Sequence, residues 1–502
     1  MDVLKGVIGL IALATAPAAL ATNGYFSHGY SISQKAMGGA GTALVEDGLI
    51  GTINPAGNVW ADEGVDMLLS MFIPIRRYRS SERGEDAQNG IFSIAPGYRR
   101  SHNEYYPIPA VSYNRAWGER MSWGVSMYGN GGLNTEYIGN TAIFGEGLTG
   151  FEAECDGSFG GGEPIGQDNL GFCGNRSART GVDLAVLFLA PNVSMKLGDR
   201  SSIGISPLLA MSRFAAQGLG AFAKFSNDPD KVTNNGHELS FGAGYRIGVL
   251  TGLIPGISLG ASYQSKVWMD PFEDYRGLFA GQGDFDIPET WNVGLAVRIT
   301  ENQRLVFDYQ RINYSGITSV NNRFDSDTFV NDCAIPRLFD MSGGEPQDSP
   351  ACLGAATGPG FGWQDMEVYK FGYQYRFGGY AFRIGYSQTE QPIPDSEVLF
   401  NVLAPGVIEK HYTAGVSVRL SERFTLETSF MFAPDRPVTG KNPLSNTDAN
   451  LLTLAGAGLG LDPLTGLLTG GAEGAFVADE NDQDIKLNMQ QYEITVGLGW
   501  RF

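Results

Sequence analysis

The chain has 502 residues, of which 54 are Asp or Glu and 35 are Lys or Arg, and this acidic balance argues against nucleic-acid binding. A mean hydropathy of −0.11 excludes a bundle of membrane-spanning helices. Glycine (69 residues) and aromatic residues (11%) are abundant, and charged residues are few (18%). A membrane barrel explains this combination, because its lipid-facing and lumen-facing residues alternate and cancel in any average over a window.

The chain begins with its only long apolar run, residues 6–21. Ala19-Leu20-Ala21 fits the small-x-small cleavage rule, so residues 1–21 are predicted to be an export signal peptide and Thr22 the first residue of the mature chain. An uncleaved anchor is the alternative, but the run is short for a membrane span.

The next segment, residues 22–64, is rich in glycine and carries little charge up to residue 57. Its Gly38–Gly41 run lacks the lysine of a phosphate-binding loop, so we interpret the glycines as allowing tight backbone packing. Asn54-Pro55 fits a rigid turn at the end of the segment. We predict that residues 22–64 form a hatch, a plug inside a barrel.

The rest of the chain, residues 65–502, consists of segments in which apolar residues alternate with polar or very small ones. The clearest is the last, where the apolar residues from Tyr492 to Phe502 share one face and Glu493, Thr495 and Gly497 lie on the other. The same alternation recurs at 239–249, 257–264, 291–298, 369–377, 380–387, 412–420 and 424–432. Weaker candidate strands near 65–80, 108–117, 120–129, 182–197, 200–216 and 303–315 bring the total to about fourteen.

Short and long connections alternate between these strands. Short turns are expected at 117–120, 198–200, 255–256, 301–302, 378–379 and 421–422, and long stretches separate them. This alternation is typical of outer-membrane barrels, with short turns on the periplasmic side and long loops outside. The sequence therefore predicts an all-β fold, a transmembrane antiparallel barrel of about fourteen strands with its lumen plugged by the hatch. Its parts are the signal peptide 1–21, the hatch 22–64 and the barrel 65–502.

Four cysteines fall in two local pairs within the predicted loops. Cys155 pairs with Cys173 and Cys333 with Cys352, which in an exported protein indicates two disulfides. Metal binding is the weaker alternative, because the spacing is not that of a zinc site and no histidine lies near either pair.

Catalytic chemistry has little support in the sequence. The chain has only four histidines, at His28, His102, His237 and His411, and no nucleophile elbow or metal-ligand spacing accompanies them. We predict no catalytic residues, no metal and no cofactor.

One predicted strand is interrupted by glycine. Gly129, Asn130, Gly131 and Gly132 follow the apolar alternation of residues 121–127 and should produce a bulge or end the strand early. A plain loop start is the alternative.

Several motifs resemble those of FadL-type outer-membrane transporters, which import long-chain fatty acids and aromatic hydrocarbons. The N-terminal matches are Asn23–Phe26, Met37–Gly41, Asp47 and Asn54–Gly57, and later ones are Gly129–Thr135, Pro288-Glu289, Asp308–Ser315 and Gly360–Met366. The resemblance implies ligand-binding or gating roles in the hatch for Phe26, Asn54, Pro55 and Ala56. It also implies an inward kink at residues 129–132 that opens the barrel wall laterally. Phe502, at the end of the last strand, resembles the outer-membrane assembly signal.

Two further features bear on the ligand. Arginines on the polar faces of strands could meet a carboxylate, and salt bridges to lumen acids such as Asp308 and Glu427 are the alternative; the candidates are Arg246, Arg298, Arg376 and Arg383. The apolar loop stretch 451–468 is interpreted either as a surface that captures hydrophobic solutes or as loop structure packed on the barrel mouth.

Taken together, these observations predict a monomeric channel in the bacterial outer membrane for passive transport of hydrophobic compounds, either long-chain fatty acids or aromatic hydrocarbons. Its expected partners are the hydrophobic small molecule, outer-membrane lipid and lipopolysaccharide, and the assembly machinery, with no nucleic acid. A general diffusion porin for polar solutes and a surface or adhesion barrel without transport are the alternatives.

Overall fold

The computed structural model describes residues 23–82, 92–138, 143–144, 179–338, 348–445 and 480–502. The predicted signal peptide 1–21, the Cys155 and Cys173 pair and the apolar stretch 451–468 lie outside the described residues.

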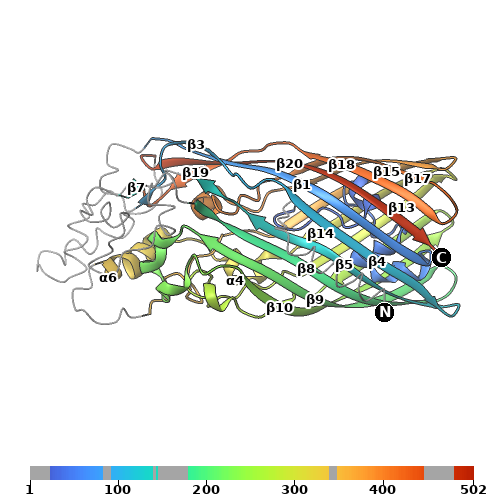
Figure 1. Ribbon diagram of the computed structural model, residues 1–502, viewed down its shortest axis with the longest axis horizontal. Helices are drawn as coiled ribbons and strands as arrows, with labels where there is room; N and C mark the ends of the chain where they lie inside the picture. The colour runs from blue at the N-terminus through green and yellow to red at the C-terminus, as the bar shows by residue number, and fades with distance from the viewer. Residues whose placement is uncertain (1–22, 83–91, 139–142, 145–178, 339–347, 446–479) are drawn as a thin grey trace, which may run out of the picture.

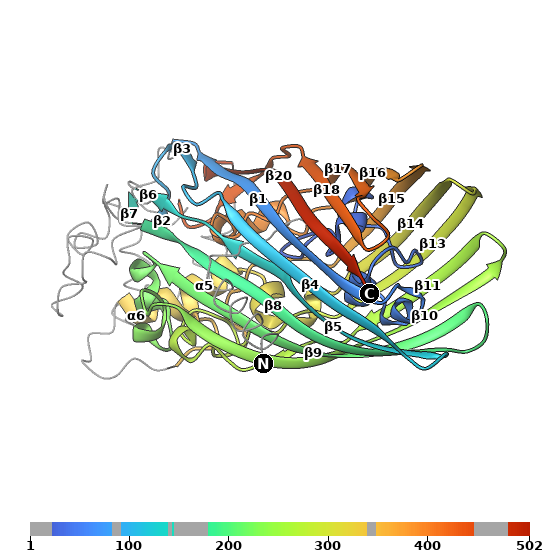
Figure 2. The same cartoon turned by 45° about the vertical axis from the view of Figure 1, so that its right-hand side comes forward.

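Fourteen antiparallel strands form a closed barrel (Figures 1 and 2), which confirms the predicted fold class. The barrel closes where β1 pairs with β20, in a register that runs from Gly64↔Arg501 to Ser80↔Ile485. Its strands are β1 (Gly64–Ser80), β4 (Tyr106–Trp117), β5 (Met121–Asn134), β8 (Arg179–Lys196), β9 (Ser201–Gln217), β10 (Glu238–Ile254), β11 (Ile257–Gln264), β13 (Thr290–Thr300), β14 (Gln303–Ile312), β15 (Met366–Phe377), β16 (Tyr380–Thr389), β17 (Lys410–Arg419), β18 (Phe424–Ala433) and β20 (Gln483–Arg501).

Short strands lie at the long-loop end, where four of them extend the wall and two form a separate small sheet. They are β2 (Phe92–Ser93), β3 (Gly97–Arg100), β6 (Tyr137–Ile138), β7 (Ile143–Phe144), β12 (Trp268–Met269) and β19 (Val438–Asn442). Of these, β3 pairs with β1, β6 with β8, β12 with β10 and β19 with β20, while β2 and β7 pair with each other.

Short helical turns lie in the loops and in the hatch. The loops carry η6 (Gly220–Phe225), η7 (Pro229–Lys231), η8 (Glu273–Tyr275), η9 (Tyr314–Gly316), α4 (Thr318–Asn321), α5 (Ser326–Phe329), η10 (Val330–Ala334), α6 (Ile335–Leu338), η11 (Asp395–Glu397) and α7 (Val398–Asn401). The hatch carries α2 (Ile32–Ala36), η1 (Gly48–Thr52) and η2 (Pro55–Trp60). Among the residues that the structure describes, no helix combines the length and apolar character needed to cross a bilayer.

The barrel wall carries its apolar side chains on the outside and its polar side chains on the inside, which is the reverse of the arrangement in a water-soluble protein. On β20, Trp500 is 41% exposed on the outside, while the inward-facing Glu493 is only 3% exposed. Large apolar side chains form the exposed outer face all around the barrel, among them Leu69, Ile205, Phe241, Val293, Phe371, Ile384, Phe430 and Val496. Such a surface is stable in contact with lipid hydrocarbon rather than with water.

The apolar belt ends partway along the longest strands. The outward residues Arg77 and Arg79 of β1 are paired in register with Asn488 and Lys486 of β20, so the outer face is polar at this level. The inward-facing Leu487 of the same strand is completely buried. The strands therefore continue beyond the bilayer, where their outside is polar and their inside apolar.

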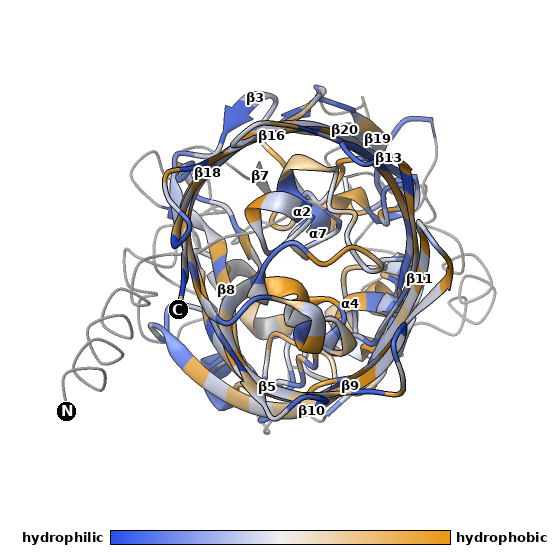
Figure 3. Ribbon diagram, turned by 90° about the vertical axis from the view of Figure 1, so that its right-hand side faces the viewer, coloured by the Kyte–Doolittle hydropathy of each residue, from blue (hydrophilic) through white to orange (hydrophobic). Residues whose placement is uncertain are grey.

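The first strand, β1, begins and the last strand, β20, ends at the side of the short turns, and the long loops lie at the other side (Figure 1). A view along the barrel shows α2 inside the ring of strands, with α4 and α7 from the loops also projecting within it (Figure 3). The short-turn half of the lumen is filled by the hatch, and nearly all described hatch residues before Val59 are buried.

Candidate functional site

The hatch is bound to the wall at three main points, the first of which is Asp308 on β14. Its Oδ2 accepts hydrogen bonds from the backbone N–H groups of Gly41 and Thr42, both at 2.8 Å, and from the Thr42 hydroxyl at 2.7 Å. Asp308 thus holds the hatch backbone, and it forms no salt bridge with the candidate arginines.

The second point is Glu46, a hatch residue whose carboxylate lies among arginines of three strands. The carboxylate is 2.8 Å from Arg304, 2.5 Å from Arg376 and 3.1 Å from Arg383. Because Glu46 is only 5% exposed, these pairs fix the hatch near the short-turn end of the barrel.

The third point is Lys35 at the end of α2. Its Nζ lies 2.7 Å from Oε1 of Glu493, and both side chains are buried. The ring of His28 lies 3.5 Å from the same carboxylate and stacks on His411 of β17, with ring centres 5.7 Å apart. A buried ion pair thus joins α2 to the last strand.

Lumen-facing glycines let the hatch backbone touch the wall. A Cβ at Gly260 would overlap the carbonyl oxygen of Thr42, and one at Gly385 would overlap the backbone of Gly38. Gly38 itself has a φ of +67°, which other residues rarely adopt. The close approach of the hatch backbone therefore explains why some residues on the polar face of the strands are glycines.

The four candidate arginines do not converge on one point. Arg376 and Arg383 bind Glu46, and Arg383 also lies 3.6 Å from Glu427. Arg246 donates to the Tyr128 hydroxyl at 3.0 Å and to Gln264. Arg298 lies near a short turn, half-exposed and 3.6 Å from Glu301. Three of the four candidates thus form ion pairs, and Glu46 of the hatch is the partner of two of them. The pair expected with Glu427 is formed by Arg383.

The hatch residues Asn54, Pro55 and Ala56 pack against β9 and β10. The Asn54 side-chain amide donates to the carbonyl oxygen of Val249 at 3.0 Å, and the Ser202 hydroxyl donates to that of Ala56 at 2.7 Å. Pro55 begins η2, where its missing N–H costs nothing. Phe26 belongs to a separate aromatic cluster with Tyr25 and Tyr314.

The predicted irregularity in β5 is a β-bulge. Gly129 pairs with Leu187 of β8 and Gly131 with Val186, so Asn130 is the extra residue. Beyond the bulge, β5 bonds to the hatch: Ser27 N–H donates to the Asn130 carbonyl at 3.0 Å, and Gly132 N–H donates to that of Tyr25 at 2.9 Å. The Asn130 side chain accepts from the hydroxyl of Tyr30 at 2.8 Å.

At the same level, β5 separates from β4. Pairing between these strands ends at Ala110↔Tyr128, although β4 remains paired with β1 as far as Tyr106. Pro107 and Pro109 occupy the unpaired part of β4, and a proline has no N–H to donate to a neighbouring strand. The wall therefore has a break in its hydrogen-bond ladder, beside the segment of β5 that pairs with the hatch.

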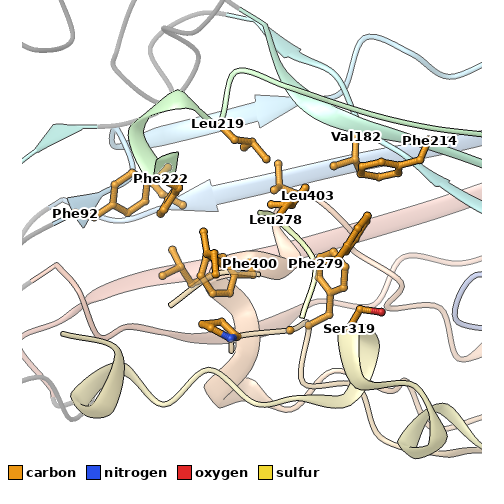
Figure 4. A pocket seen from close by; sticks show the side chains of 16 residues that line it. Phe92, Val182, Phe214, Leu219, Phe222, Leu278, Phe279, Ser319, Phe400 and Leu403 are labelled. Carbon is orange, nitrogen blue, oxygen red and sulfur yellow. The ribbon is translucent and has the colours of Figure 1, made fainter. Parts of the chain in front are cut away.

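An apolar cavity lies among the loops at the opposite end from the short turns (Figure 4). Ser319 carries the only polar side chain among the residues that line it. Its walls come from β8, β9 and several loops: Phe92, Ile94, Val182, Phe214, Leu219, Phe222, Leu278, Phe279, Ser319, Leu353, Pro359, Gly360, Phe361, Leu399, Phe400 and Leu403.

The lining of the cavity is uncharged and rich in phenylalanine, and a further aromatic ring packs beside it. Tyr275 packs on Phe214 with ring centres 4.8 Å apart, and its hydroxyl donates to the carbonyl of Gly236. Burial raises the pKa of the Tyr275 hydroxyl, so this group stays neutral at physiological pH.

A chain of aromatic rings connects the cavity to the bulge. Phe279 lines the cavity and lies 5.0 Å from Phe285, whose ring is 6.0 Å from that of Tyr25. Tyr25 stacks on Phe26 at 5.1 Å, and Phe26 forms a β-bridge with Gly131. A row of packed aromatic rings thus joins the loop cavity to the break in the wall.

Trp363 makes a second aromatic connection between the cavity and the hatch. Its ring lies 6.5 Å from Phe361 of the cavity and 5.2 Å from Tyr314, which in turn bonds to the hatch. The Trp363 indole N–H donates to the Asn401 side chain at 2.6 Å, so the completely buried ring is fixed in orientation.

The disulfide that joins Cys333 and Cys352 lies beside the cavity, with Cα atoms 5.2 Å apart. Leu353, the residue after Cys352, lines the cavity, so the disulfide ties a loop to its wall. This is the second of the two cysteine pairs expected from the sequence.

Sequence reasoning missed the cavity because most of its aromatic residues lie in loops, where no strand periodicity marks them. The concentration of phenylalanines in the stretches 217–236 and 269–287 was the available signal. The Pro107 and Pro109 pattern was likewise available as a mark of an unpaired strand edge.

The fold is that of a hatch-plugged barrel that several solved transport proteins share. The Pseudomonas putida toluene transporter TodX has 16% sequence identity and a TM-score of 0.58, over 95% of this chain and 99% of that one. The Ralstonia pickettii toluene transporter TbuX has 14% identity and a TM-score of 0.51, over 95% of this chain and 99% of that one. A FadL homologue of Pseudomonas aeruginosa has 11% identity and a TM-score of 0.59, over 95% of this chain and all of that one (100%).

No family model matches the sequence, and no curated protein matches it. At these identities, the likeness to the solved structures establishes a shared fold.

Proposed function

We propose that this protein is a passive outer-membrane channel for small hydrophobic compounds, which bind in the loop cavity and leave sideways between β4 and β5. The observation that carries the proposal is the row of packed aromatic rings that joins the cavity, through Phe285 and Tyr25, to the bulge at Asn130. The shared fold with the toluene transporters TodX and TbuX adds support.

A sideways exit agrees with the chemistry of the solute. An apolar molecule gains free energy when it leaves the path for lipid hydrocarbon, whereas a downward exit would pass the charged hatch anchors around Glu46. No covalent step and no energy source are needed, because the solute moves down its own gradient.

The hatch segment Tyr25–Ser27 is the proposed gate. It occupies the edge of β5 that β4 leaves unpaired. Backbone hydrogen bonds to β5 hold it there, together with the packing of Tyr25 and Phe26 against Tyr314. Displacement of Phe26 from Gly131 would open the path to the break in the wall, so Phe26 and residues 129–132 carry the gating role. In this scheme Asn54, Pro55 and Ala56 anchor the hatch and do not touch the solute.

The surroundings of the channel follow from its outer surface. The apolar belt contacts the lipid and the acyl chains of lipopolysaccharide, and the C-terminal strand that ends in Phe502 is the segment offered to the assembly machinery. One chain contains the whole proposed path, and the channel therefore works as a monomer.

Uptake by whole cells tests this function, since lipopolysaccharide slows the entry of hydrophobic compounds. A Gram-negative host that lacks its own fatty-acid and hydrocarbon channels is given the protein, and the entry of radiolabelled toluene and of glucose is measured. We expect toluene entry to rise severalfold over that of cells with an empty vector, and glucose entry to remain unchanged. Faster glucose entry without faster toluene entry would indicate a diffusion porin. No change in the entry of either compound would indicate a surface barrel that transports neither.

A further inference from the structure

A row of four exposed side chains crosses the outer face of the barrel just beyond the apolar belt. The row runs over β19, β20, β1 and β3, which are paired side by side at the long-loop end (Figure 1). At its centre, Arg79 of β1 lies opposite Lys486 of β20. Thr439 of β19 is opposite Lys486, and Tyr98 of β3 is opposite Arg79. All four side chains are exposed and carry hydrogen-bond donors, so we call this set the donor row.

The two cations of the donor row repel each other. Residues directly opposite in an antiparallel pair have Cβ atoms about 4.5–5.5 Å apart, and like charges at such positions destabilise the sheet. Among the residues that the structure describes, no acid forms an ion pair with Arg79 or Lys486. An anion that binds between the two side chains would replace this repulsion by two attractions.

The acids around the donor row are held by other cations. The pairs, with the distance between their nitrogen and oxygen atoms, are Arg77 with Asp435 at 2.7 Å, Arg100 with Glu104 at 2.6 Å, and Lys441 with Asp484 at 3.1 Å. The whole chain has a formal net charge of −19, so two adjacent cations run against its overall balance. An anionic partner from outside the chain fits them.

The donor row lies close to the lipid headgroups. The outward-facing residues of β1 are apolar from Met67 to Ile75 and cationic at Arg77 and Arg79. Arg79 is about 13 Å along the strand from Ile75, and the tilt of the strand reduces this to about 10 Å across the membrane. Headgroups occupy roughly the first 5–8 Å beyond the hydrocarbon, and long arginine and lysine side chains reach this layer.

A phosphate group is the anion that matches the donor row. Its several acceptor oxygens bind both a guanidinium fork and an ammonium group, and the hydroxyls of Thr439 and Tyr98 lie on either side to donate to the remaining oxygens. With the long loops outside the cell, this end of the barrel meets the outer leaflet. That leaflet consists of lipopolysaccharide, whose lipid A headgroup carries phosphates next to its acyl chains.

We propose that Arg79 and Lys486 form a binding site for a lipid A phosphate, which Thr439 and Tyr98 complete. The acyl chains of the same molecule then lie against the apolar belt beside the site. This inference goes beyond transport, because it assigns the barrel a site for a membrane lipid on the outer face of the wall. It depends on the outer-membrane location and not on the solute.

Equilibrium binding of radiolabelled lipid A to the purified, delipidated full-length protein in a non-ionic maltoside tests the proposal. The double variant Arg79→Gln/Lys486→Gln removes both charges from exposed positions, and its folding is checked by heat-modifiable migration. We expect its affinity for lipid A to fall about tenfold or more. The matched control is Arg419→Gln/Arg423→Gln, which removes two exposed cations at the short-turn end and should bind lipid A as the wild type does.

Dephosphorylated lipid A is the second probe, because it keeps the acyl chains and lacks the phosphates. The wild type should bind it about tenfold more weakly than lipid A, and the double variant should bind both probes equally weakly. Wild-type affinity for lipid A in the folded double variant would overturn the proposal, and so would equal affinity of the wild type for the two probes. Phosphatidylglycerol that binds the wild type as tightly as lipid A would overturn the assignment to lipopolysaccharide.

The single variants keep the test decisive if the double variant does not fold. Arg79→Gln and Lys486→Gln should each lose part of the affinity for lipid A, and an unchanged affinity in both would equally overturn the site. Failure of the channel function is distinguishable, because toluene entry and lipid A binding are measured separately.

Discussion

Glu46 allows a quantitative test of how the hatch is held. In Glu46→Gln, the carboxylate that three arginines share becomes a neutral amide of the same shape. The barrel strands keep their own hydrogen bonds, so we expect the barrel to fold and the hatch to leave the wall more often.

The size of the effect follows from the burial of the three partners. Breaking a buried ion pair costs about 3–5 kcal/mol, and a solvent-exposed pair contributes about 0–1 kcal/mol. Only Arg383 is fully buried (3% exposed), and it keeps a second acid, Glu427, at 3.6 Å, while Arg304 and Arg376 are 28% and 41% exposed. We therefore expect a loss of about 2–3 kcal/mol, which makes the detached hatch roughly 30- to 150-fold more populated.

Thiol labelling measures this population. Ala40 is completely buried under the wall, so an Ala40→Cys thiol reacts only when the hatch is detached, and its labelling rate reports the detached fraction. The matched control is Glu63→Gln at the end of the hatch, where the pair with Arg115 spans 3.8 Å and both groups are about half exposed (45% and 58%). A labelling rate in Glu46→Gln equal to that of the control would refute the anchoring role.

Two further predictions concern the second anchor and the cavity. Lys35→Met leaves the Glu493 carboxylate buried without its lysine partner, so labelling of the Ala40→Cys thiol should become about tenfold faster or more. Adding Glu493→Gln should reverse most of this increase. A double variant whose thiol is labelled as fast as that of the single variant contradicts a direct pair. Phe279→Asn places an amide in the apolar cavity, so the affinity of the purified protein for radiolabelled toluene should fall about tenfold. Phe279→Leu should lose less affinity, because leucine is apolar. Unchanged affinity in both variants would exclude the cavity as the binding site.

The strands could be predicted from the sequence because lipid on one face and the lumen on the other impose a period of two residues on their side chains. Lipid outside and a packed lumen inside force alternation along β20, and the short turns follow from the hairpins that connect such strands. The bulge at Asn130 could also be predicted, since three glycines beside it weaken a regular ladder.

The contacts that hold the hatch could not be predicted, because they join residues far apart in the chain. Gly41 and Asp308 are separated by 267 residues, and nothing local in either segment indicates the other. The cavity shows the same limit: Phe222, Phe279 and Phe400 come from three separate loops and meet only when the barrel closes.

The lateral exit is most directly tested by removing the bulge itself. Deletion of Asn130 takes out the one residue that has no partner in β8, so β5 can continue beside β4 and close the break in the wall. The control is Asn130→Ala, which loses the bond to the Tyr30 hydroxyl but keeps the bulge. Both variants are checked for the heat-modifiable migration of a folded barrel, and the entry of radiolabelled toluene into cells is then measured. We expect entry to fall to the level of cells without the channel in the deletion variant and to persist in Asn130→Ala. Entry at the wild-type rate through a folded deletion variant would show that the solute does not leave between β4 and β5.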